Sequence, residues 1–419
     1  MSMDIINRLE SEVRGYVRSF PTEFKTARGN RMTDVDGHEY LDFFSGAGAL
    51  NYGHNDRDME AALLDYIKSG GINHGLDMAT EAKTRFMETF EEIILKPRKL
   101  DYKFQFPGPT GTNAVEAALK LARKYTGRSG MIHFTHSFHG MTLGSTSVTS
   151  NAAIRNSAGV GLSDTTTAAF DGYYRDGRDT IADLEALLAD SFSGVDKPAA
   201  VIVETVQGEG GIYAAGFDWL REVARVCREH DLLFIVDDIQ AGYGRTGPFF
   251  SFEPAEIQPD IVTLAKSISG MGSPMSLVLM RPEIDVWDAG EHTGTFRGNN
   301  HAFVTGATAL EKFWRDDQLT RHVDEQGERI RTRLQEIIDK HDGFDGEVRG
   351  RGFFIGLDCA EPDHGNAVIK QCFERGLIME TTGPGDRVIK VMPPLISTAE
   401  DIDEGLAIID DAIGAALAA

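Results

Sequence analysis

One lysine stands directly after a short apolar run, in the stretch PDIVTLAKSISG at 259–270. The residues before Lys266 have the pattern of a buried strand, and a turn containing glycine follows them. An ammonium group at the edge of a core costs free energy unless it has a partner, a lowered pKa or a covalent attachment. Lys266 is therefore the first candidate for chemistry.

Two carboxylates occupy the same kind of position. LLFIVDDIQAGYGRTG places Asp237 after an apolar run, and AAVIVETVQGEGG does the same for Glu204. A carboxylate at the end of a buried strand is poorly solvated and stays an anion where a cation lies against it. Taken alone, each is equally well explained as a helix cap or a loop salt bridge.

A helix entrance offers an anion site. Gly111 and Thr112 begin the amphipathic segment GTNAVEAALKLARKYTG, where we expect Asn113 and Glu116 to form a pair like a capping box. Free N–H groups at a helix start suit a phosphate. No Gly-Lys-Ser/Thr follows, so the segment is not a P-loop, and an ordinary capped helix remains the alternative.

Aromatic and hydroxyl groups complete the set. Phe138 and His139 follow the apolar run GMIHFT, and an aromatic ring at a strand end can stack on a planar ligand or simply pack. Thr295, in the loop GEHTGTFRGNNH, could donate its hydroxyl to a phosphate. We count these three residues among the candidates for binding a cofactor.

The combination is more specific than its parts. A phosphate site, a stacking face, a buried carboxylate and a strand-end lysine are what a site for pyridoxal 5′-phosphate requires. Lys266 would form a Schiff base with the aldehyde, and Asp237 would pair with the pyridine nitrogen and keep it protonated. The ring could then accept the electrons released when a C–H bond breaks. The sequence therefore predicts a pyridoxal-phosphate enzyme.

The elements that must position these residues alternate along the chain. Apolar strands separated by helices predict an α/β domain with a mostly parallel sheet covered on both faces, and its ligands lie beyond the carboxyl ends of the strands. From about 344 the pattern changes to a smaller α+β unit. The expected strands are 102–107, 130–135, 199–205, 232–238 and 260–266; the expected helices include 5–18, 56–69, 79–96, 113–125, 179–190, 217–230, 302–341 and 364–375.

Composition excludes several classes of function. The net charge of −23 over 419 residues argues against nucleic acid and anionic membranes as partners. GAGAL at 46–50 lacks the third glycine of a dinucleotide fingerprint, so a Rossmann dehydrogenase is not expected. The three cysteines lack metal-ligand spacing, so we expect no metal and a reducing compartment. Since no secretory signal or membrane-length apolar run is visible, we expect a cytoplasmic protein.

Three segments in order resemble the class III (ω-) aminotransferases: VDDIQAGYGRTG, PDIVTLAKSISGMGSPMS and TGTFRGNNHA. The resemblance covers essentially the whole chain. It implies fold type I of the pyridoxal-phosphate enzymes, with a large cofactor domain over 51–320 and a small domain built from 1–50 and 321–419. It also implies a homodimer or a higher homo-oligomer, with the active site between subunits.

The resemblance also implies roles for single residues. Lys266 matches the Schiff-base lysine, Asp237 the partner of the pyridine nitrogen, and Glu204 the gating glutamate that helps to distinguish the two substrates. Phe138 matches the stacking aromatic, and Gln240 matches the glutamine near the ring hydroxyl. Gly111 and Thr112 match the phosphate loop, and Thr295 matches the phosphate contact that comes from the other subunit.

The sequence departs from the family pattern in three places. TGTNA stands where the family often has Ser-Gly-Thr-Glu-Ala, and DDIQAG is close to the usual Asp-Glu-Val-Gln-Thr-Gly but not identical. Many members also carry an arginine before a C-terminal Pro-Pro pair, which grips the α-carboxylate of glutamate or 2-oxoglutarate. VIKVMPPL offers Lys390 there, and lysine cannot form the bidentate pair that arginine forms.

Further segments are similar to the diaminobutyrate-forming members of this family: RLESEVRGYVRSFPTEF, LDFFSGAGALNYGHN, GGINHGLDMATEAK and FPGPTGTNAVEAALKLARK. This implies transfer of an amino group from L-glutamate to L-aspartate 4-semialdehyde, the first step of ectoine biosynthesis. The products would be L-2,4-diaminobutyrate and 2-oxoglutarate. The alternatives are an acetylornithine, ornithine or 4-aminobutyrate aminotransferase, or a non-catalytic regulator with the same fold.

Overall fold

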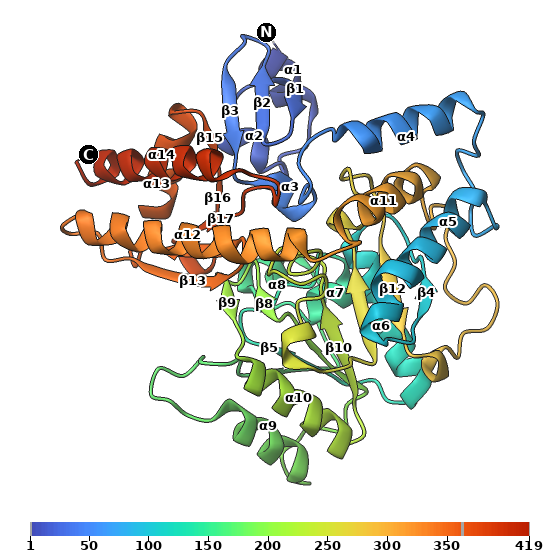
Figure 1. The fold of residues 1–419 in the computed structure, drawn as a ribbon. Coiled ribbons are helices and arrows are strands. Elements are labelled where there is room, and N and C mark those ends of the chain that lie inside the picture. The colour runs from blue at the N-terminus through green and yellow to red at the C-terminus, as the bar shows by residue number, and fades with distance from the viewer. Residues whose placement is uncertain (1, 362–363, 419) are drawn as a thin grey trace.

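A seven-stranded sheet forms the centre of the computed structural model, which describes residues 2–361 and 364–418 (Figure 1). Its four pairings from β11 to β6 are parallel, whereas β12 runs antiparallel to both β11 and β4. The mostly parallel sheet is thus confirmed. In sheet order the strands are β4 (Lys103–Gln105), β12 (Leu277–Met280), β11 (Ile261–Leu264), β10 (Leu233–Asp237), β7 (Ala200–Val203), β5 (Met131–Phe134) and β6 (Thr165–Ala168).

Helices cover both faces of this sheet, because alternate residues of each strand point into different cores. Val236 and Val262 pack on the side of α10 (Phe217–Glu229), while Ile235 and Ile261 pack against α6 (Gly111–Thr126). The other helices of this domain are α4 (Arg57–Lys68), α5 (Glu81–Phe90), α7 (Leu143–Ser147), α8 (Ala152–Ser157), α9 (Thr180–Ala189) and α11 (Asn300–Phe313), and the short turn α3 (Ser45–Gly48) precedes them.

A smaller α+β domain joins the two ends of the chain. The N-terminal strands β1 (Phe24–Arg28), β2 (Arg31–Asp34) and β3 (Glu39–Asp42) continue in β15 (Leu377–Ile378), which pairs in parallel with β3. A second sheet is antiparallel throughout and has the order β13 (Glu347–Arg351), β14 (Phe354–Asp358), β17 (Val388–Val391) and β16 (Glu380–Thr382). The expected fold class, with a small domain from both termini, is confirmed.

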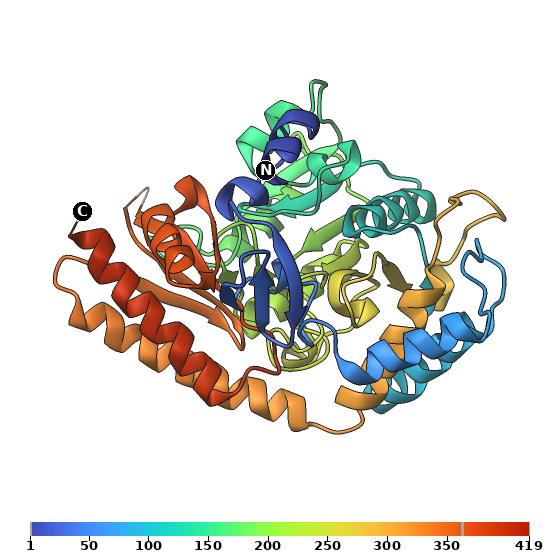
Figure 2. The same ribbon diagram turned by 90° about the horizontal axis from the view of Figure 1, so that it is seen from above.

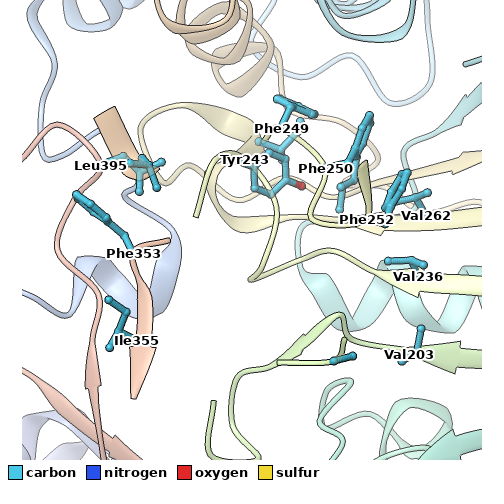
Figure 3. Packing of buried hydrophobic residues seen from close by; sticks show 14 of the residues in the cluster. Val203, Val236, Tyr243, Phe249, Phe250, Phe252, Val262, Phe353, Ile355 and Leu395 are labelled. Atoms are coloured by element: carbon cyan, nitrogen blue, oxygen red, sulfur yellow. The ribbon is translucent and has the colours of Figure 1, made fainter. Parts of the chain in front are cut away.

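Three helices complete this domain: α12 (Gln318–Lys340), α13 (His364–Glu374) and α14 (Ala399–Leu417). The long helices α12 and α14 lie side by side, as Figure 2 shows. The two domains share one core. In Figure 3, Phe353, Ile355 and Leu395 of the small domain lie near the aromatic group Tyr243, Phe249, Phe250 and Phe252 of the large domain.

Two predicted helices are wrong as single elements. The one expected at 5–18 is split into α1 (Ser2–Leu9) and α2 (Tyr16–Ser19), with Gly15 before the second. The one expected at 302–341 ends at Phe313 and begins again at Gln318, where the Asp316 carboxylate accepts from the Gln318 N–H at 2.9 Å. Local polar groups that cap a new helix outweigh the continuous hydrophobic period there.

Short elements lie near the carboxyl edge of the large sheet. A two-stranded ribbon is formed by β8 (Val206–Gln207) and β9 (Tyr213–Ala214), and a 3-10 turn spans Lys266–Ser269. Among the described residues, no helix combines the length and the apolarity needed to cross a membrane.

Candidate active site

The predicted residues meet at the carboxyl edge of the large sheet. Asp237 is the last residue of β10, Glu204 follows β7 directly, and Lys266 lies two residues beyond β11. Parallel strands end at the same edge, so their end residues come together. One cavity of about 370 Å³ is lined by these three and by Gly111, Thr112, Phe138, His139 and Gln240.

Asp237 is held by its own chain from three directions. Its carboxylate accepts from the Thr263 hydroxyl at 3.0 Å and the Ile239 N–H at 3.2 Å, and lies 2.7 Å from His139 Nδ1. Burial of His139 lowers its pKa, because a charged ring is poorly solvated there. The hydrogen bond to Asp237 and the negative charge of Asp237 outweigh this effect, so the pKa of His139 is raised. The pair therefore presents an oriented carboxylate at the floor of the cavity.

Lys266 occupies a strained backbone position, with φ of 53° in the left-handed region that side-chain-bearing residues rarely adopt. Desolvation is the main cause that lowers the pKa of Lys266 to about 8, while Glu209 acts in the opposite direction. An amine with this pKa is partly neutral near neutral pH, which suits a nucleophile or a base.

The first turn of α6 faces the same cavity. Thr110 is the N-cap, and its N–H and hydroxyl bond the Asn113 side chain at 3.2 and 2.8 Å, so the expected pairing of Asn113 with Glu116 is wrong. Glu116 instead accepts from the N–H of Gly144 at 2.9 Å, at the start of α7. A Cβ at Gly111 would lie 3.0 Å from Ile239 Cδ1, so glycine permits the close approach there.

Glu204 supports backbone on both sides of the cavity. Its carboxylate accepts from the N–H of Phe138 at 2.9 Å and of Gly208 at 3.1 Å. Burial raises the pKa of Glu204 to about 7, with His139 acting in the opposite direction. The side chain thus positions the residue expected to stack on the cofactor, a contact that its place after β7 did not reveal.

Gln240 connects the cavity to the N-terminal segment, because its amide donates to the Ala47 carbonyl at 2.9 Å. Thr295 is exposed on the loop before α11 and is not among the residues that line this cavity. Its contact with a phosphate in the other subunit stays a prediction.

Lys390 does not stand free to bind a substrate. It lies on β17 with its side chain 0% exposed, and its Nζ bonds Glu209 Oε1 at 2.5 Å and Glu380 Oε1 at 2.9 Å. The Tyr16 hydroxyl in turn donates to Glu380 Oε2 at 3.3 Å. We name these four residues the lysine–glutamate cluster.

Sequence reasoning missed three members of this cluster. Glu209 was visible as the second acid of VETVQGEGG, in the loop that follows Glu204. Glu380 faces Lys390 across two strands that only the folded small domain brings together. Tyr16 lay in a segment expected to be plain helix, so no local pattern marked it.

Comparison with known proteins identifies the family. The model of the family Aminotransferase class-III matches residues 14–413. The chain belongs to the class III aminotransferases. A diaminobutyrate–2-oxoglutarate transaminase of Marinococcus halophilus is 54% identical over 98% of this chain and 96% of its own length. A protein of the same name from Bordetella parapertussis is also 54% identical, over 100% of this chain and 96% of its own.

Solved structures share the fold. An ornithine aminotransferase of Toxoplasma gondii, solved with partial occupancy of PLP at its active site, superposes with a TM-score of 0.86 at 26% identity, covering 100% of this chain and 94% of that one. An aminotransferase of Bacillus anthracis superposes with a TM-score of 0.88 at 24% identity, covering 99% and 97%.

The cofactor of this family is pyridoxal 5′-phosphate, and the cavity fits it. The helix start at Gly111 provides N–H groups without intrahelical partners for a phosphate. The carboxylate of Asp237 suits a protonated ring nitrogen, and the amine of Lys266 suits an aldehyde. All three groups line the same space, whose volume lies within the usual range for small-molecule sites.

Proposed function

We propose that this aminotransferase moves an amino group from L-glutamate to L-aspartate 4-semialdehyde, giving L-2,4-diaminobutyrate and 2-oxoglutarate, as the first step of ectoine biosynthesis. The observation that carries the proposal is the 54% identity over nearly the whole chain to proteins named diaminobutyrate–2-oxoglutarate transaminase. The motif-bearing residues that line the cavity support it independently.

Two ends of the cavity would bind the cofactor. The first turn of α6 would take the phosphate at Gly111 and Thr112, and Lys266 would hold the aldehyde through its amine. Phe138 would cover one face of the ring, and Gln240 would lie near the ring hydroxyl. Pyridoxal 5′-phosphate, when bound, accepts the electron pair left by a broken C–H bond.

Asp237 would keep a proton on the ring nitrogen, because a nearby carboxylate favours the charged form of a base. The bonds from Thr263 and Ile239 orient that carboxylate, and the pairing with His139 balances its charge. Glu204 would act on the site through the backbone of Phe138 and Gly208.

Lys266 would carry the proton. When it does not hold the cofactor, its amine would act as the base that takes a proton from the substrate carbon bearing the reacting nitrogen, and as the acid that gives a proton back. A base must be neutral to accept a proton, and the lowered pKa of about 8 keeps a useful fraction of this amine neutral.

The active unit would be a homodimer or a higher homo-oligomer with the site at its interface. Three large apolar side chains are exposed, two at or just before the start of α7 and one on the loop before α11: Met141 at 62%, Leu143 at 55% and Phe296 at 67%. Exposed apolar side chains favour an interaction between proteins where they form a patch. Thr295 lies beside Phe296 and could reach a neighbouring subunit's phosphate. Light scattering on the purified protein would test this, and a monomer that retains activity would contradict it.

The decisive experiment is an end-point assay for diaminobutyrate from L-glutamate and L-aspartate 4-semialdehyde. We expect product only when both substrates and the cofactor are present. The alternatives are acetylornithine, ornithine and 4-aminobutyrate aminotransferases. The similarity to the Toxoplasma gondii ornithine aminotransferase is a reason to include ornithine in the test. A panel of these amines at fixed 2-oxoglutarate separates them from diaminobutyrate. A visible absorption band that shifts on adding glutamate would exclude the non-catalytic regulator.

A further inference from the structure

The lysine–glutamate cluster carries more acid than base. Lys390 bonds both Glu209 and Glu380, so these three side chains hold one cation and two carboxyl groups. Glu209 and Glu380 belong to different segments, and a buried group of this kind costs desolvation energy that an imperfect charge balance does not repay. A second cation would complete the cluster.

The cluster lies next to residues that line the cavity, although none of its four members lines it. Glu209 follows Gly208, and Gly208 lies so close to Gln240 that a Cβ there would be 1.8 Å from the Gln240 amide oxygen. Gln240 itself lines the cavity beside Lys266. On the other side, Tyr16 is 53% exposed and the Glu209 side chain 35% exposed, so the cluster is open in two places.

Charges in the cluster and Lys266 affect one another. Burial raises the pKa of Glu380, with Glu209 adding to the effect and Lys390 and Lys266 opposing it. The pKa of Glu209 is lowered: burial opposes its charge, but Lys390 and then Lys266 outweigh that effect. Lys390 is shared between the two carboxylates, so a cation brought by a substrate would improve their charge balance.

We propose that Glu380, together with Glu209, binds the α-ammonium group of an amino acid whose reacting nitrogen is at the far end of its chain. This inference rests on the proposed function. By it, Glu380 and Glu209 are the residues that distinguish diaminobutyrate from an amine without an α-ammonium group. Lys390 orients the two carboxylates and is not itself the group that grips a substrate carboxylate. The Tyr16 hydroxyl fixes the second oxygen of Glu380.

The chemistry provides a matched pair of substrates. L-2,4-Diaminobutyrate and 4-aminobutyrate carry the same reacting amine at C4 and the same carboxylate, and differ only in the ammonium group at C2. The holoenzyme is mixed with each, and the bound cofactor's absorbance is followed in a single half-reaction. We expect the wild-type protein to prefer diaminobutyrate by about 100-fold or more in rate constant over Kd, the scale of charge-assisted hydrogen bonds to a buried carboxylate.

Glu380→Gln keeps the shape and leaves Lys390 paired with Glu209, so the fold should tolerate it. We expect the preference for diaminobutyrate over 4-aminobutyrate to fall about tenfold or more, because the variant should slow the reaction with diaminobutyrate more than the reaction with 4-aminobutyrate. Glu209→Gln is the second variant, with the same expected direction. Glu347→Gln, an exposed acid on β13 of the same sheet, is the control and should change each rate by no more than about twofold.

The outcomes separate this inference from the proposed function. A wild-type protein that reacts with glutamate but not with diaminobutyrate would contradict the proposed function. A wild-type protein that prefers diaminobutyrate, together with two glutamine variants that bind cofactor and keep the full preference, would overturn the inference alone. Equal losses for both amines in the variants would also overturn it, because they would indicate a general defect.

Discussion

The two ends of this site are built in different ways. At the cofactor end, Asp237, Glu204 and Lys266 each stand at or just beyond the end of a strand in one sheet. At the substrate end, the lysine–glutamate cluster draws Tyr16, Glu209, Glu380 and Lys390 from four segments. Glu380 and Lys390 face each other on the paired strands β16 and β17, and tertiary contacts bring the other two residues to them. The cofactor end is therefore built by the edge of one sheet. The substrate end is built where the small domain packs against the large domain.

This contrast predicts how each end fails when it is changed. The cofactor takes part in both half-reactions, so defects at the cofactor end should affect both substrates alike. The substrate end should distinguish between substrates, or affect the stability of the docked small domain. The substitutions below test this difference from the largest expected effect to the smallest.

Lys266→Ala should abolish turnover. The residue would supply both the attachment of the cofactor and the proton transfer, and loss of a positioned acid–base group alone costs about 10²–10⁴-fold in rate. Both half-reactions, with glutamate and with diaminobutyrate, should fall by about 10⁴-fold. Single-turnover absorbance measurements would show this. Lys103→Ala, at a half-exposed lysine paired with Asp285, is the control and should retain activity; wild-type rates without Lys266 would refute the assignment.

Lys390→Met should instead destabilise the protein. Removing the ammonium leaves the buried Glu380 without its cation, and breaking a buried pair in this way costs about 3–5 kcal/mol. Water screens the part of the effect that falls on Glu209, whose side chain is about one third exposed. Thermal melting of the holoenzyme would report the loss. Adding Glu380→Gln to Lys390→Met should recover part of it, because one uncompensated charge is removed. An unchanged melting temperature for the single variant would show that the cluster carries no such charge.

Asp237→Asn should slow proton removal far more than it weakens cofactor binding. The substitution removes the negative charge that would favour a protonated ring nitrogen, and a charged hydrogen bond of this kind is worth about 10–100-fold in rate. Both half-reactions should slow by the same factor, while the absorbance of the bound cofactor stays near the wild-type value. Asp218→Asn on the surface of α10 serves as the control. Equal single-turnover rates for Asp237→Asn and wild type would contradict the electron-sink role.

The contrast between the cofactor end and the substrate end also explains which site residues could be predicted from the sequence. Lys266, Asp237 and Glu204 follow apolar runs, so strand ends alone placed them in one cavity. Glu209, Glu380 and Tyr16 lie on no shared element, and spacing carries no information on their proximity. The side-chain partner of Asp237 was also hidden, because His139 reaches it across 98 residues of chain.

The fold shows the same limit. The five predicted strands of the large sheet were found, since apolar runs of that length are a strong signal. The break between α11 and α12 was not predicted, because only part of what accompanies it is local. Besides the bond between Asp316 and Gln318, the indole N–H of Trp314 bonds the buried Tyr52 hydroxyl at 2.8 Å. A contact between positions 52 and 314 is formed only by folding, and local propensity cannot register it.

The smallest effect concerns Lys266 in the apoprotein. Its pKa in the folded chain is about 8, below the usual 10.5, so the unfolded chain binds this proton more tightly. The contribution of Lys266 to the free energy of unfolding therefore rises with pH between about 8 and 10.5. Below about pH 8, the loss of stability caused by burying its ammonium group is complete. Lys266→Met, which carries no charge, should stabilise the apoprotein at pH 7 by about 1–2 kcal/mol, and the gain should shrink as the pH approaches 10.5.

Melting curves of the apoproteins across this range would measure that gain. In the wild-type holoenzyme the lysine amine would be occupied by the cofactor, so the same alkaline rise should be absent. Lys103→Met, at an exposed lysine, is the matched control substitution. A gain for Lys266→Met that is constant with pH would mean that packing, and not the desolvated ammonium, limits the stability of the cofactor end.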